Sequence, residues 1–127
     1  MIINASGYDE GRPKLTLLWT NPNPTAEFKA NQVAEFDRGD YSVLYIACLA
    51  SDKYQYLTTT PVINDANIVG QTVRCRAGMT AGSRTITLSD NGIIFSTGTY
   101  ESCATNGSLS ASTGTKYVIP YKIYGGV

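Results

Sequence analysis

Short runs of alternating apolar and polar residues recur along the chain, and turn residues separate them about every ten residues. β-branched and aromatic residues dominate these runs, which is typical of strands rather than helices. We expect strands at residues 14–20, 32–36, 42–50, 54–60, 67–76, 84–89, 93–96, 99–104 and 116–124. Only residues 25–34, behind Pro24, have a helical character, and they predict no more than one turn. The pattern predicts an all-β fold, a single-domain, jelly-roll-like antiparallel β-sandwich without substantial helix.

Residues 90–92 (DNG) give the clearest local signal, because Asn-Gly between two apolar runs favours a tight hairpin with positive φ. The alternation on the first of these strands predicts that Ile86 and Leu88 face the core. Thr85 and Thr87 are then expected to face solvent.

Two further runs are apolar on both faces. Residues 41–50 form the longest apolar window and predict a central strand that is covered on each side. In the C-terminal run, residues 117–124 alternate aromatic and aliphatic side chains around Pro120, which cannot donate to a strand ladder. We therefore expect that strand at a sheet edge or a bulge, where a neighbouring subunit could cover it.

Glycine-rich and serine-rich segments predict the connections. Residues 78–82 (GMTAG) lack the ending of a phosphate-binding loop and are expected to form a turn. Residues 106–115 contain few bulky side chains and predict a surface loop. Residues 1–13 contain little that could be buried, so we expect an N-terminal arm or linker at 1–13 and the sandwich domain at 14–127.

The amino-acid composition excludes several classes of function and indicates no specific one. The 127 residues include no His, which excludes Ser-His-Asp and Cys-His catalysis and histidine metal sites. Ten Lys and Arg balance ten Asp and Glu, and the chain lacks the cationic excess that nucleic-acid binding needs. We expect no catalytic residues, no cofactor and no nucleic-acid partner.

The three cysteines, Cys48, Cys75 and Cys103, are odd in number and include no C-x-x-C pair. We expect neither a metal site nor an intrachain disulfide. The start of the chain has no basic segment followed by an apolar run, which predicts no signal peptide of that type. The apolar window at 41–50 is about half the length of a membrane-spanning helix, so we expect no membrane span.

A few side chains are candidates for contact with a ligand or another subunit. Tyr54 and Tyr56 share a face of one expected strand and suit stacking on a sugar or packing at a subunit interface. Arg74 and Arg76 share a face of the next strand and could clamp a carboxylate or a sulfated sugar, although exposed strand arginines also serve cross-strand ion pairs. The C-terminal strand adds two further candidates, Tyr117 and Tyr121.

Residues 17–33 (LLWTNPNPTAEFKANQV) resemble a segment of structural proteins of tailed bacteriophages and prophages of Gram-positive bacteria. Residues 84–88 (RTITL), 90–95 (DNGIIF) and 117–125 (YVIPYKIYG) look like the later strands of the same small domain. The resemblance rests on strand and turn residues and implies no catalytic signature. It implies a virion protein of the tail, baseplate or fibre, whose β-rich domains form trimers or rings.

The sequence thus favours a non-catalytic virion structural or host-attachment protein, assembled in the host bacterial cytoplasm, that acts through oligomeric interfaces. Its expected partners are further copies of the chain, other virion proteins and host cell-surface polysaccharide. Two alternatives remain open: a carbohydrate-binding module, and a small glycan hydrolase that uses two of the ten carboxylates.

Overall fold

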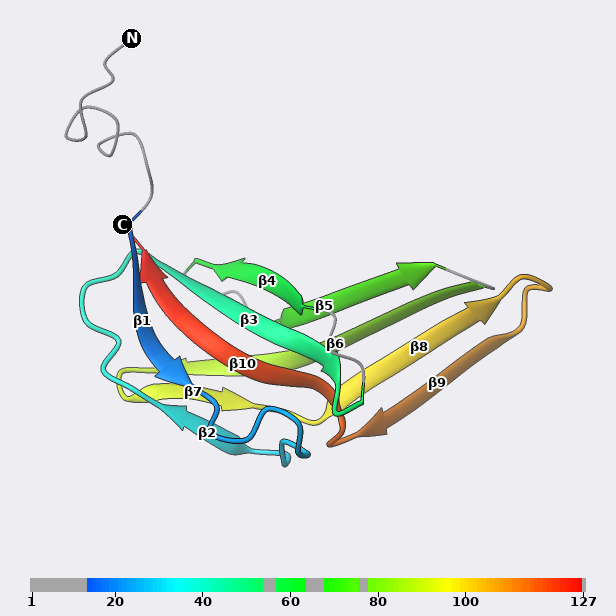
Figure 1. Cartoon of the computed structure of the whole chain (residues 1–127), viewed down its shortest axis with the longest axis horizontal. Helices are drawn as coiled ribbons and strands as arrows, with labels where there is room; N and C mark the ends of the chain where they lie inside the picture. Colours follow the sequence, from blue (N-terminus) through cyan, green and yellow to red (C-terminus); the bar gives the residue numbers. More distant parts are fainter. Residues whose placement is uncertain (1–13, 54–56, 64–67, 76–77, 127) are drawn as a thin grey trace, which may run out of the picture.

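The fold is a β-sandwich from which one sheet extends as a wing, as a computed structural model of the chain shows (Figure 1). The structure describes residues 14–53, 57–63, 68–75 and 78–126, and for 68–75 it describes the backbone. The strands are β1 (Leu15–Thr20), β2 (Gln32–Glu35), β3 (Val43–Ser51), β4 (Leu57–Val62), β5 (Ile68–Cys75), β6 (Gly78–Ser89), β7 (Gly92–Phe95), β8 (Gly98–Ala104), β9 (Leu109–Gly114) and β10 (Tyr117–Gly126). The described residues contain no helix, so the predicted all-β sandwich is confirmed.

All strand pairs are antiparallel and form two sheets. The first sheet has the order β1-β10-β3-β4. The second has the order β2-β7-β6-β8-β9, and β5 pairs with β6 as well. Four of the eight described pairs, β3–β4, β5–β6, β6–β7 and β8–β9, join strands that follow one another in the chain, because a short turn can link two antiparallel neighbours directly.

The second sheet has two halves because β6 is long enough to pair at both ends. Its residues 86–89 pair with β7, and β2 lies beyond β7. Its residues 78–83 pair with β8, and β9 lies beyond β8. On the other side of β6, β5 pairs with residues 79–85. We call the half made by β5, β8, β9 and residues 78–83 the wing, and the rest of the molecule the body (Figure 1).

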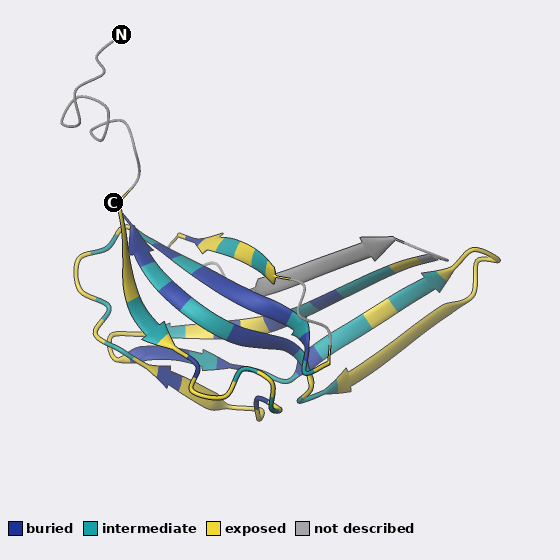
Figure 2. Cartoon of the chain, viewed as in Figure 1, coloured by how far each residue is buried: buried dark blue, intermediate teal, exposed yellow. Residues whose placement is uncertain are grey.

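The core lies in the body, between the first sheet and the body half of the second. Its largest buried side chains are Phe28, Phe95, Ile46, Ile93, Ile119 and Ile123. Trp19 packs against this cluster and meets Phe28 edge-to-face at 6.2 Å between ring centroids, as expected for a packing residue. Figure 2 shows that burial is concentrated in β3 and β10, whereas β9 is exposed along most of its length.

Each of the two runs with apolar residues on both faces forms a strand that has a neighbouring strand on either side. β3 lies between β10 and β4, which confirms the predicted central strand. β10 lies between β1 and β3, so it is not an edge strand; the register shifts between Pro120 and Lys122, and the bulge was the correct alternative. The strand's own sheet and the core bury Ile119 and Ile123 completely within one chain.

The hairpin at residues 90–92 is confirmed, because Leu88 pairs with Ile93 and Ser89 with Gly92. Asn91 is not among the residues with positive φ; Gly92 has a φ of 146°. A Cβ at Gly92 would collide with the carbonyl oxygen of Ala34 on β2. Glycine is therefore required here by the close approach of β2 as well as by its φ.

Two predicted connections are strands instead. Residues 78–82 open β6 and pair with both β5 and β8, so the predicted turn at GMTAG is wrong. Residues 109–114 form β9, so the predicted loop at 106–115 is limited to residues 106–108 and residue 115. Small residues misled both predictions, since Gly, Ala and Ser lower strand propensity but fit a strand that neighbouring strands support. Residues 25–34 contain no helical turn, within the expected limit of one turn; a hydrogen bond from Ala26 N to Asn23 O of 3.2 Å closes a turn at residues 23–26 instead.

Candidate interaction surfaces and the junction that positions them

A buried arginine holds the junction between body and wing. Arg84 lies on β6 where the two halves meet and is 1% exposed. Alternation places it on the inward face with Ile86, so the expected inward and outward residues of this strand are confirmed, with Thr85 and Thr87 exposed. Because its neighbours in the core are apolar, the guanidinium needs hydrogen-bond acceptors from the backbone.

Five hydrogen bonds, all to backbone carbonyl oxygens, satisfy Arg84 within the described residues. Nε donates to Tyr117 O at 3.0 Å and to Val118 O at 2.7 Å, and Nη1 donates to Ser96 O at 2.6 Å. Nη2 donates to Phe28 O at 3.0 Å and to Thr115 O at 3.1 Å. These carbonyls precede β2, separate β7 from β8, and surround the start of β10, so one side chain ties together the segments at the base of the wing.

Burial also sets the ionisation of the two titratable groups in this part of the core. Desolvation lowers the pKa of Arg84 to about 10, against the opposing effect of Cys48. Desolvation likewise raises the pKa of the fully buried Cys48 thiol to about 12, and the charge of Arg84 lowers it only partly. At neutral pH the arginine is therefore charged and the thiol neutral, which suits structural groups rather than reactive ones.

Val118, one of the residues bonded by Arg84, has a strained backbone. Its φ is 51°, a value that a β-branched residue adopts at a cost of about 1–3 kcal/mol. The bond from Arg84 Nε to its carbonyl, together with the complete burial of its side chain, offsets that strain. The strain thus lies at the junction, near the start of β10.

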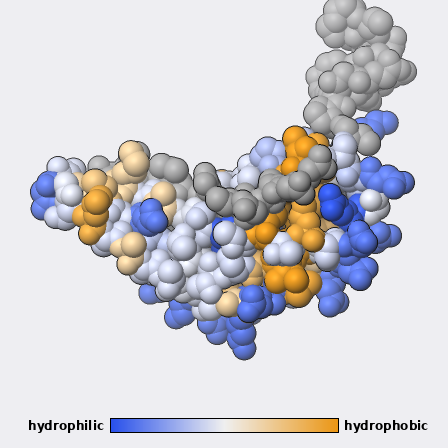
Figure 3. Space-filling model, turned by 180° about the vertical axis from the view of Figure 1, so that it is seen from behind, coloured by the Kyte–Doolittle hydropathy of each residue, from blue (hydrophilic) through white to orange (hydrophobic). Residues whose placement is uncertain are grey.

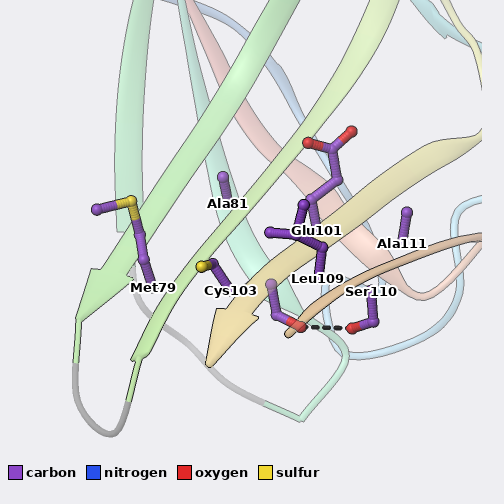
Figure 4. Close-up of a pocket in the computed structure, with 8 residues that line it drawn as sticks. Met79, Ala81, Glu101, Cys103, Leu109, Ser110 and Ala111 are labelled. Atoms are coloured by element: carbon purple, nitrogen blue, oxygen red, sulfur yellow. Dashed lines mark hydrogen bonds between the residues drawn. The ribbon is translucent and has the colours of Figure 1, made fainter. Parts of the chain in front are cut away.

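The outer face of the wing has a groove of about 460 Å³. Two cross-strand rows line it: Met79–Cys103–Leu109 and Ala81–Glu101–Ala111. In Figure 4 the side chains of the first row come from β6, β8 and β9 in turn. Met79 is 54% and Leu109 80% exposed, so the groove presents apolar side chains to solvent, with one charged residue, Glu101, among those that line it.

The inner face of the wing is aromatic and hydroxyl-bearing. Tyr100 stacks on Tyr117 with 5.1 Å between ring centroids, and the Ser112 hydroxyl lies 3.4 Å from the Tyr117 hydroxyl. The Ser102 and Ser110 hydroxyls are hydrogen-bonded at 2.6 Å (Figure 4). Tyr117 therefore joins the start of β10 to the inner face of the wing.

The outer face of the first sheet carries a second apolar surface. The register places Leu17, Tyr124, Tyr45 and Pro61 in one row across β1, β10, β3 and β4. Leu17 is 50% exposed, Pro61 is exposed and both tyrosines are half-buried. We call this set the outer row. Figure 3 shows, on one side of the molecule, that apolar residues reach the surface on both the wing and the body.

Of the residues proposed from the sequence, the structure describes the surroundings of Tyr117 and Tyr121 and the backbone of Arg74. Tyr117 belongs to the wing junction, whereas Tyr121 packs against the core with Lys122 Nζ 5.0 Å from its ring centroid. The backbone of Arg74 pairs with Thr80 on β6, while Tyr54, Tyr56 and Arg76 lie outside the described residues.

Two sets of residues escaped the sequence reasoning. Arg84 was missed because an arginine in an alternating strand is usually on the exposed face. Its position two residues before Ile86 nevertheless places it on the same, inward face of the strand. The groove was missed because residues 78–82 and 109–114 were predicted as connections.

The two cysteines whose side chains the structure describes have different surroundings. Cys48 is buried in the core beside Arg84, and Cys103 is half-exposed in the groove; both are free thiols. In the described part of the chain, no helix has the length and apolar character needed to cross a membrane. A scan against protein-family models, a search of curated proteins and a search of solved structures each gave no match.

Proposed function

We propose that this chain is a non-catalytic structural or host-attachment protein of a bacteriophage virion and that it works through contacts between sheet surfaces. The observation that carries the proposal is the wing. Three of its strands extend away from the core and expose Met79 and Leu109 across a groove, although such side chains are usually buried in an isolated domain.

The outer row supports the same function on the other side of the molecule. Leu17, Tyr45 and Tyr124 combine apolar area with phenolic hydroxyls, which is the composition favoured at protein–protein interfaces. Two separate apolar surfaces suit a component that must bind more than one neighbour, such as a second copy and another virion protein.

The rigid attachment of the wing fits a structural role. Arg84 fixes the wing to the body through five carbonyl groups, so the two surfaces keep a constant relative position. The resemblance of residues 17–33 and 117–125 to structural proteins of tailed phages supplies the virion context.

Mass spectrometry of purified particles tests the proposal. Prophages of the strain that encodes the chain are induced, tailed particles are banded by density, and their proteins are quantified against a cytosolic marker. We expect this chain to be enriched in the particle band with the tail proteins. Its recovery only in the soluble fraction would contradict the virion role.

The purified protein separates the two alternatives from the proposal. Retention of a monomer on cell-wall polysaccharide would favour the carbohydrate-binding module. Release of reducing sugar from that polysaccharide, lost on replacing an exposed carboxylate such as Glu101 by Gln, would favour the glycan hydrolase.

A further inference from the structure

β9 differs from every other edge strand that the structure describes. Edge strands are normally protected from pairing with another chain by proline, charge, irregular register or short length. β1 and β5 have register shifts, β4 contains Pro61, and β2 has four residues and ends on Glu35. β9 has none of these features.

The sequence of β9 is LSASTG, without charge or proline, and its six residues pair with β8 without a register shift. Its first five residues are exposed, and Leu109 alone is 80% exposed. β9 therefore presents a regular, neutral and accessible edge over its full length.

The hydrogen-bonding parity shows which backbone groups of β9 are available. At the hairpin between β8 and β9, Ala104 N donates to Ser108 O at 2.9 Å, so this pair is of the hydrogen-bonded type. Such pairs alternate along an antiparallel ladder, so Ser110 and Ser112 also bond to β8. The N–H and C=O groups of Leu109, Ala111 and Thr113 point away from β8, toward the open side.

We infer that β9 pairs antiparallel with β9 of a second copy of this chain, about a two-fold axis at Ala111. In this register Ala111 lies opposite Ala111 of the partner subunit, and Leu109 lies opposite Thr113 of the partner subunit. Each of the three pairs exchanges two hydrogen bonds, giving about six in total. The two wings become one continuous sheet, and the row Met79–Cys103–Leu109 continues into the partner.

The chemistry of β9 favours a second copy as its occupant. The strand is self-complementary, because the pairing places Ala opposite Ala and Leu opposite Thr and sets no charges in contact. Glu101 is one strand further in, about 14 Å from Glu101 of the partner subunit, beyond the screening length of about 8 Å at physiological salt.

The position of the wing also leaves room for the partner. β9 begins near the tip of the wing and ends beside the body (Figure 1). In an antiparallel pair, the two bodies therefore lie at opposite ends of the joined wings. This inference rests on the proposed assembly role and specifies one of the contacts through which it operates.

Cysteine cross-linking tests the register directly. Ala111→Cys is introduced with Cys75→Ser and Cys103→Ser, and the matched control is Thr113→Cys in the same background. The axis places the two residues 111 about 5.5 Å apart, within disulfide reach, whereas the two residues 113 are about 14 Å apart. Under mild oxidation we expect at least about tenfold more cross-linked dimer from Ala111→Cys than from the control. Equal cross-linking of the two variants would overturn the register.

Two further substitutions at Ala111 test the pairing without forming a disulfide. Ala111→Pro removes an N–H that points away from β8, so it should leave the monomer ladder intact while blocking the partner. We expect light scattering to show at least a tenfold weaker dimer, with an unchanged melting temperature at dilutions where the wild type is monomeric. Ala111→Lys places like charges across the axis and should weaken the dimer more at low than at high salt.

A dimer that is insensitive to both Ala111 variants would overturn the inference. This outcome is distinguishable from failure of the proposed function. A monomeric chain that is enriched in particles would refute β9 pairing alone, whereas a β9-paired dimer absent from particles would refute the virion role alone.

Discussion

At the scale of single residues, Arg84 is a buried charge that contacts several segments of the chain. A buried charge is costly unless hydrogen bonds replace the water that it loses, and five carbonyl groups do so here. Its position also explains how a chain with one compact core keeps a wing that contributes few residues to that core.

Replacing Arg84 tests this role. We expect Arg84→Met to lower the free energy of unfolding by about 3 kcal/mol or more, because five carbonyl groups in three segments lose their donor. Arg84→Lys should recover only part of the loss, since one ammonium group cannot reach all five oxygens. Urea unfolding measures both, with the exposed Lys53→Met as a control expected within about 0.5 kcal/mol of wild type.

Amide exchange distinguishes a junction residue from an ordinary core residue. In Arg84→Met, exchange should accelerate most at residues 96–98 and 114–118, where the lost acceptors lie, and least in β3. Uniform acceleration across both sheets would show that Arg84 stabilises the core in general and does not specifically hold the wing.

At the scale of elements, the β6–β7 hairpin depends on Gly92 for two separable reasons. Gly92 and Gly107 both have positive φ, but only at Gly92 would a Cβ meet another strand, and at Gly107 it would meet nothing within 4 Å. Gly107→Ala thus measures the cost of the conformation, and Gly92→Ala measures that cost plus the collision with Ala34 on β2.

We expect Gly92→Ala to destabilise the protein clearly more than Gly107→Ala, whose cost should be about 1 kcal/mol. Gly92→Val should be worse still, because a β-branched side chain fits neither the φ nor the space. Urea unfolding of the three variants provides the comparison. Equal losses for the two alanine variants would show that the approach of β2 does not constrain the hairpin.

The strands that could be predicted from the sequence are those in which the pattern of apolar and polar side chains indicates which face is buried. The alternation of Ile86 and Leu88 with threonines located the inward face, and the double-sided apolar run at 41–50 located a central strand. β9 and the start of β6 were unpredictable for the converse reason, since Gly, Ala and Ser carry little hydrophobic pattern and depend on neighbouring strands.

The candidate surfaces were less predictable than the fold. Pro120 indicated a bulge or an edge, but only pairing with both β1 and β3 shows that β10 is central. The groove and the outer row each combine residues from three or four strands, and their register depends on long-range pairing that a single sequence does not specify.

At the scale of the whole molecule, the features combine into one account. The core closes within a single chain, so association is not needed to complete it. Met79, Leu109, Leu17 and the neutral edge of β9 instead remain outside the core, on surfaces that Arg84 holds in place. In this account, the chain functions by joining such surfaces.

Sedimentation velocity of the unmodified chain tests that claim most directly. The sample is measured in reducing buffer at physiological salt, at concentrations from about 1 µM to about 500 µM, where moderate interfaces populate their complexes. We expect a reversible shift from the monomer of 13.7 kDa to a species of at least twice that mass as the concentration rises. A single monomeric species over the whole range would contradict it.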